Sequence, residues 1–183
     1  MKKLIATASL LILFPMLALA QSAPSADHAY RGDGYLFFGL GNGTNYAING
    51  RAIGSAVVEQ VGGGGEVNLY SGFGVAAELG YAHWSQGPSG AAWTPSGDLL
   101  LHFKRNKTRG LVDPFVFGGV SGYIPTTYGA RGSWAVNFGG GVNLWFSKHT
   151  ALRLEFRDYA TTSSHDLQPG GNYASFRVGV TFR

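Results

Sequence analysis

The sequence contains no cysteine and few charged residues, which make up 13% of the chain. Disulfides and thiolate metal ligands are therefore excluded. The histidines also lack the short, regular spacing of a metal site; they are His28, His83, His102, His149 and His165. We expect no cofactor and no metal. The net charge of +4 is small and includes Lys2 and Lys3, so nothing points to a nucleic-acid partner.

Long apolar runs are absent except for one at the beginning of the chain. Lys2 and Lys3 precede an apolar stretch from Leu4 to Leu17, and small residues at Ala18 and Ala20 provide a cleavage site. This pattern is that of a secretory signal peptide, and it is too short to span a membrane. We predict a cleaved signal peptide at 1–20, a short flexible leader at 21–32 and a single domain at 33–183.

What the chain does contain is alternation of apolar and polar residues. In the stretch 134–159, Leu152, Leu154 and Phe156 alternate with charged residues. Successive side chains of a strand point to opposite faces, so a period of two predicts strands with one apolar and one polar face. The same pattern recurs along the domain and predicts strands at about 35–41, 63–69, 73–84, 98–104, 113–123, 134–146, 151–159 and 173–183.

The predicted connections alternate between long and short along the chain. The long ones fall at 42–61, 85–97, 124–132 and 161–171, and short turns separate the other strands. A transmembrane β-barrel has short turns at one end, long loops at the other and an even number of strands. The sequence therefore predicts an all-β protein, an eight-stranded antiparallel up-and-down transmembrane β-barrel.

In such a barrel the apolar faces contact lipid, and we assign Phe115, Phe117 and Tyr123 of the fifth strand to that face. Aromatic residues near strand ends are expected in the interface girdles; they are Tyr81, Trp84, Tyr123, Trp134, Phe146 and Tyr159. The polar faces would fill a narrow interior, where charges must be paired. We predict an interior ion-pair network of Glu66, Glu78, Arg153, Glu155, Arg157 and Arg177, together with interior Asn68, His102 and Asn143.

The two hairpin sequences GGGVNLW…TALRLEFRDY and GGGGEVNLYSGFGVAAELGY, with the signal peptide, resemble small bacterial outer-membrane barrels of the OmpA/OmpX type. The resemblance is to the stand-alone outer membrane protein β-barrel domain group and covers the whole mature chain. It implies export through the general secretory pathway and residence in the bacterial outer membrane. It also implies an assembly signal, carried here by Val178, Val180 and Phe182 and followed by Arg183.

The function that we predict is a non-enzymatic, monomeric outer-membrane barrel with a structural and surface-contact role and a plugged interior. Its partners would be outer-membrane lipids and lipopolysaccharide, periplasmic chaperones and the outer-membrane assembly machinery. The basic residues Lys104, Arg105, Lys107 and Arg109 form a predicted turn that can touch anionic head groups.

Three other functions stay open. The pair His83 and Ser85 resembles the His/Ser pair of outer-membrane enzymes that deacylate lipid A, with Asp98 as the carboxylate that would orient the histidine. A narrow passive pore and a soluble periplasmic lipocalin-like barrel are the remaining alternatives.

The sequence from Ser164 to Asp166 offers a second serine–histidine–aspartate combination. A glycine pattern that begins at Gly72 lacks the helix that a dinucleotide site requires.

Overall fold

The computed structural model describes residues 32–46, 52–70, 72–85, 90–103, 112–126, 132–161 and 172–183. These residues form eight β-strands and no helix long and apolar enough to cross a membrane. The strands are β1 (Gly32–Tyr46), β2 (Ala52–Tyr70), β3 (Phe73–Trp84), β4 (Gly90–His102), β5 (Val112–Pro125), β6 (Ser133–Trp145), β7 (Thr150–Thr161) and β8 (Tyr173–Phe182).

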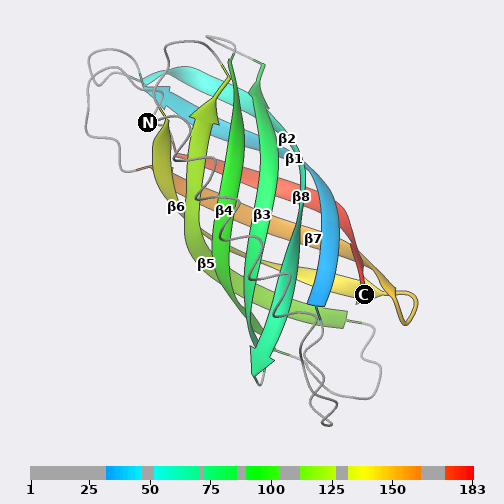
Figure 1. The fold of residues 1–183 in the computed structure, drawn as a ribbon. Helices are drawn as coiled ribbons and strands as arrows, with labels where there is room; N and C mark the ends of the chain where they lie inside the picture. The colour runs from blue at the N-terminus through cyan, green and yellow to red at the C-terminus, as the bar shows by residue number, and fades with distance from the viewer. Residues whose placement is uncertain are drawn as a thin grey trace.

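Each strand pairs antiparallel with the next along the chain, and β8 pairs with β1 to close a barrel. In Figure 1 the strands of the front wall cross those of the rear wall, because all of them are tilted against the barrel axis. Closure gives every wall strand a hydrogen-bonding neighbour on both sides, which a sheet needs in hydrocarbon. The predicted fold class is confirmed.

Two ends of the barrel are distinguished by their connections. The turn end carries the β2–β3, β4–β5 and β6–β7 connections, and the loop end carries the other four. At the turn end Gly72 has a φ of 90°, a backbone conformation that favours glycine. The backbone N–H of His102 donates to the carbonyl of Gly72, which links the β2–β3 turn to β4. The glycine pattern at Gly72 leads into strand β3, as the sequence indicated.

The predicted extent of two long loops is wrong, because much of each segment is strand. β1 continues to Tyr46 and β2 begins at Ala52, and β4 begins at Gly90 rather than at the predicted residue 98. These extensions lie toward the loop end, and the outward positions that the structure describes there mix the apolar Trp93 with Glu59 and Pro95. Their glycine-rich and asparagine-rich sequences therefore lack the alternation that reveals the middle of each strand.

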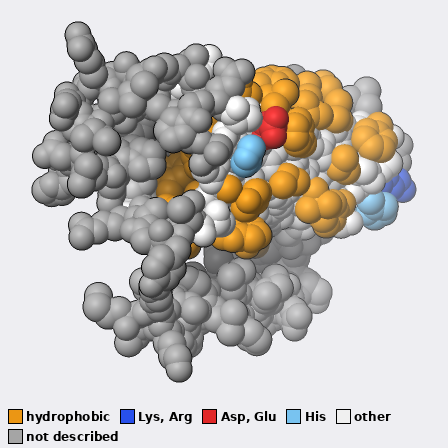
Figure 2. Space-filling model, turned by 90° about the horizontal axis from the view of Figure 1, so that it is seen from above, with side chains coloured by type: hydrophobic (Ala, Val, Ile, Leu, Met, Phe, Trp, Pro, Cys, Tyr) orange, Lys and Arg blue, Asp and Glu red, His pale blue; other side chains and the backbone are white. Residues whose placement is uncertain are grey.

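Large apolar side chains cover the outside of the barrel, as Figure 2 shows for the described residues on one side. The outward orientation predicted for the apolar faces of the first, third, fourth, sixth, seventh and eighth strands is confirmed. Exposed members of these faces include Leu36, Phe38, Leu40, Leu79, Leu99, Phe138, Phe156, Phe176 and Val178.

The prediction for the fifth strand is wrong. Phe115, Phe117 and Tyr123 are buried inside the barrel, and the exposed residues of β5 include Val112, Val116, Val120 and Ile124. The middle of this strand is apolar on both faces. A period of two therefore shows that it is a strand without showing which face points outward.

Candidate functional site

The interior of the barrel, which we call the lumen, is organised around three charged side chains of β7. Arg153, Glu155 and Arg157 all point inward, because each is two residues from the next along an extended strand. Glu155 lies between the two arginines, at 3.0 Å from the Nη2 of Arg153 and at 3.0 Å from the Nε of Arg157. The middle carboxylate therefore joins both guanidinium groups on its own strand.

Ion pairs also cross the lumen from β7 and β8 to the opposite wall. Arg153 reaches Glu66 of β2 at 3.2 Å, and Arg177 of β8 reaches Glu78 of β3 at 2.9 Å. Arg177 further contacts Glu155 at 3.3 Å, which connects the pairs into one network. The structure thus brings all six residues of the proposed network together, each buried inside the barrel.

Two polar residues of this network were missed from the sequence. Asp98 of β4 lies 2.9 Å from the Nη1 of Arg157, and Gln60 of β2 accepts hydrogen bonds of 3.0 and 3.2 Å from Arg177. Asp98 shares the inward parity of His102, and Gln60 that of Glu66. The alternation therefore could have placed both residues on the inward face, but Asp98 stood at the end of its predicted strand and Gln60 lay beyond the end of its own.

The arginines of the lumen lie against aromatic rings. The guanidinium carbon of Arg157 is 4.2 Å from the ring centre of Phe117, and that of Arg153 is 4.2 Å from the ring centre of Phe115. Gly139 of β6 makes room for this packing, since a Cβ there would lie 2.7 Å from the Phe117 ring. Stacking on rings suits a planar, weakly hydrated guanidinium.

Toward the loop end the lumen is filled by Tyr123, Tyr159 and Tyr173. Tyr159 and Tyr173 stack with ring centres 4.3 Å apart, and Tyr123 meets each of them edge-on at 6.1 Å. The Nη2 of Arg177 donates a hydrogen bond to the Tyr159 hydroxyl, and the Nε2 of Gln60 donates to the Tyr173 hydroxyl at 2.7 Å. The prediction that Tyr123 and Tyr159 belong to an interface girdle is therefore wrong.

Trp84 was also predicted for the girdle, but it packs against the buried cluster that contains Tyr123, Tyr159 and Tyr173. The other three predicted girdle residues lie on the outer face. Trp134 and Phe146 are strongly exposed, and Tyr81 meets Trp93 edge-on with ring centres 5.2 Å apart. Because these rings stand near strand ends, they occupy the levels at which amphipathic aromatics favour a membrane interface.

Toward the turn end His102 joins two carboxylates across the lumen. Its Nε2 lies 3.3 Å from Glu66, and its Nδ1 lies 3.1 Å from Asp113 of β5. Among the described residues, the lumen therefore contains paired charges and stacked rings from one end to the other. Such an arrangement fills and stiffens a narrow barrel.

The predicted catalytic pair does not assemble with Asp98. His83 and Ser85 are exposed on the outer face, whereas Asp98 is buried in the lumen. The carboxylate beside His83 is instead Glu59 of β2, at 3.8 Å from its Nδ1. The Ser85 contact that the structure shows is a backbone bond to Val57. The residues from Ser164 to Asp166 and the four basic residues from Lys104 to Arg109 lie outside the described residues.

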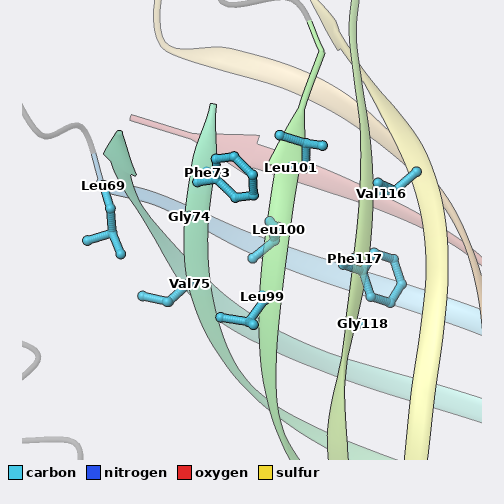
Figure 3. Close-up of a pocket in the computed structure, with 10 residues that line it drawn as sticks. All are labelled: Leu69, Phe73, Gly74, Val75, Leu99, Leu100, Leu101, Val116, Phe117 and Gly118. Carbon is cyan, nitrogen blue, oxygen red and sulfur yellow. The ribbon is translucent and has the colours of Figure 1, made fainter. Parts of the chain in front are cut away.

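An apolar hollow of about 340 Å³ lies on the outer wall near the turn end (Figure 3). It is lined mainly by outward side chains of β2 to β5: Leu69, Phe73, Val75, Leu99, Leu101 and Val116. No titratable side chain lines it. It is therefore a shallow depression in the outward apolar surface, and its lining has no group that could act as an acid, base or nucleophile.

No family model and no curated protein matches the chain. Among solved structures, it is similar to Neisserial surface protein A, with a TM-score of 0.66 and 11% identity over 82% of this chain and 96% of that one. It is also similar to the outer membrane protein OprG from Pseudomonas aeruginosa, with a TM-score of 0.55 and 10% identity over 84% of this chain and 96% of that one. These likenesses show the fold of a small transmembrane barrel.

Proposed function

We propose that this protein is an integral outer-membrane β-barrel that supports the membrane and makes surface contacts, without enzymatic activity. The observation that carries the proposal is the reversed polarity of the barrel. Apolar side chains such as Leu99, which is 69% exposed, cover the outside, and ion pairs fill the inside. In water this outer face would be an apolar patch far larger than soluble monomers tolerate.

The same observation argues against a lipocalin-like barrel. A soluble barrel that carries an apolar ligand needs an apolar cavity inside and polar side chains outside. Here the centre of the lumen holds Arg157 and Arg177, each 1% exposed. With the polarity that the structure shows, a soluble barrel would expose the apolar rows of its strands to water.

Export, assembly and partners follow from residence in the outer membrane. We propose that the signal peptide at 1–20 directs export, and that the assembly machinery reads the outward row Val178, Val180 and Phe182 of β8, which is apolar and exposed. Outer-membrane lipids and lipopolysaccharide would then surround the wall. A monomer is favoured because a closed sheet leaves no strand edge free for pairing.

Membrane fractionation combined with gel mobility tests this proposal. We expect the full-length protein in the outer-membrane fraction, and we expect it to migrate as a compact form in SDS until it is heated. Recovery in the soluble periplasm without detergent would contradict the proposal. Planar-bilayer recording provides an independent test of the plug, and we expect no single-channel conductance from the native chain.

A lipid-modifying enzyme is the second candidate, favoured by Glu59, a carboxylate next to His83 on the outer face. Its serine nucleophile would be Ser85, which requires a base within hydrogen-bond reach. Mass spectrometry of lipid A from cells that express the native chain or S85A separates the two functions. The barrel proposal predicts identical acylation in both, whereas loss of an acyl chain only with the native chain would establish the enzyme.

A further inference from the structure

An ion pair between a buried aspartate and a partly exposed arginine joins the first and last strands at the turn end of the barrel. The Nε of Arg183 donates to Asp33 Oδ1 at 2.8 Å, and its Nη2 donates to Oδ2 at 3.1 Å. Asp33 lies near the start of β1, and Arg183 directly follows β8. The pair therefore spans the seam at which the barrel closes, between residues that are 150 positions apart in sequence.

Asp33 needs this cation because of its neighbours inside the barrel. Its side chain is 1% exposed, and Glu66 faces it as the paired residue of β2. The nearby basic side chains contact other carboxylates. Arg153 contacts Glu66 and Glu155, and His102 contacts Glu66 and Asp113. Without Arg183, two carboxylates would share this wall with too little positive charge.

Arg183 also contacts two further parts of the turn end. Its guanidinium carbon lies 3.8 Å from the ring centre of Trp145 at the end of β6. Its backbone N–H donates to the carbonyl of His149, in the β6–β7 turn, at 3.0 Å. One residue therefore connects β1, β6, the β6–β7 turn and β8.

We propose that Asp33 and Arg183 form the closing clasp of the barrel. The clasp forms only when β1 and β8 meet, because its two halves belong to the first and last strands. Once formed, it neutralises Asp33, seats the guanidinium on Trp145 and holds the turn end of the seam together. The alternation of β8 explains how this is possible, since Phe182 faces outward and the next residue, Arg183, is placed on the side from which its guanidinium reaches the buried Asp33.

The first test is a double-mutant cycle on the purified full-length protein in detergent micelles. The readout is the temperature at which the compact SDS-resistant form converts to the unfolded band. R183Q leaves Asp33 buried and unpaired, so we expect a decrease of about 5 °C or more. D33N/R183Q removes both charges and should recover part of that loss.

K148Q is the matched control, because Lys148 is an exposed cation in the turn at the same end of the barrel. We expect K148Q to leave the transition temperature unchanged. A transition of R183Q within 1 °C of the native protein, or strictly additive effects of D33N and R183Q, would overturn the clasp. If R183Q does not fold, R183K, which keeps the charge but loses the two-pronged contact, should give a smaller decrease.

Hydrogen–deuterium exchange locates the effect at the seam. In R183Q we expect faster exchange in the first residues of β1 and the last residues of β8, with β3 and β4 unchanged. Equal acceleration in all strands would mean that Arg183 stabilises the barrel generally and does not act at the seam. This outcome is independent of where the protein resides, so it leaves the proposed outer-membrane function untouched.

Discussion

β7 and β5 lie two strands apart in the wall and fill the lumen in opposite ways. β7 points Arg153, Glu155 and Arg157 inward and aliphatic or aromatic residues outward, so its two faces differ strongly. β5 points Phe115, Phe117 and Tyr123 inward and Val116, Val120 and Ile124 outward, so both of its faces are largely apolar.

The difference shows that the lumen is filled by apolar as well as by charged side chains, so close packing is the property that both strands share. The arginines of β7 lie on the rings of β5, with Arg157 4.2 Å from the centre of Phe117. A planar guanidinium can use its edges for carboxylates and its faces for rings. The charged strand and the apolar strand therefore form one packed unit, in which β7 provides the charges and β5 provides the surface beneath them.

Removing a charge from β7 should have the largest effect. R157M keeps most of the side-chain length but removes the cation that contacts Glu155, Asp98 and Glu78. Glu78 and Glu155 keep Arg177, whereas Asp98 loses the ion pair that the structure shows for it. We expect a loss of about 3–5 kcal/mol in the free energy of unfolding. Guanidinium-induced unfolding in phospholipid vesicles, followed by tryptophan fluorescence, measures it, with K148M as the exposed control. Equal stability of R157M and the native chain would show that the network is not needed.

Adding a charge to the outer face of β7 should have the next largest effect. Leu154 lies between Arg153 and Glu155 in sequence but faces lipid, so L154R places a cation in hydrocarbon. The expected cost is about 2–4 kcal/mol if the residue lies near the membrane midplane. The same unfolding measurement in vesicles checks it, and L154M is the control. An unchanged stability of L154R would mean that this face of β7 is in contact with water.

A change of shape on the inner face of β5 should have the smallest effect. F117L keeps the lumen apolar at this point but removes the ring under Arg157. We expect a loss of about 1 kcal/mol, from the missing cation–π contact and imperfect packing. The double variant F117L/R157M should lose less than the sum of the single losses, because the two side chains share one contact. Additive losses would contradict the coupling between β5 and β7.

The sequence was sufficient to predict the number of strands, their order and the closed antiparallel fold. It was also sufficient to place Glu66, Glu78, Arg177 and the three charged residues of β7 on the inward face. These successes share a cause, since a charged residue between apolar neighbours leaves only one orientation that a membrane permits. The prediction was therefore strongest for β7 and β8.

The failures occur where that contrast is missing. β5 has no charge in its middle to mark the inward face, so its aromatic residues were placed on the wrong side. β4 and β2 extend beyond their amphipathic parts, so Asp98 stood at the first position of its predicted strand and Gln60 within a predicted loop. Arg183 follows the outward Phe182, and the sequence offers no sign that its guanidinium reaches Asp33, a residue 150 positions away.

The central claim is that apolar faces of the strands contact lipid around a plugged lumen, and fluorescence quenching by brominated lipids tests it most directly. The absence of native cysteine allows single labels at V120C on β5 and F156C on β7, with K148C in the exposed turn as the control. We predict strong quenching at residues 120 and 156 and little at residue 148 when the bromines lie in mid-chain. Unquenched labels at residues 120 and 156, freely accessible to a water-soluble thiol reagent, would contradict the account.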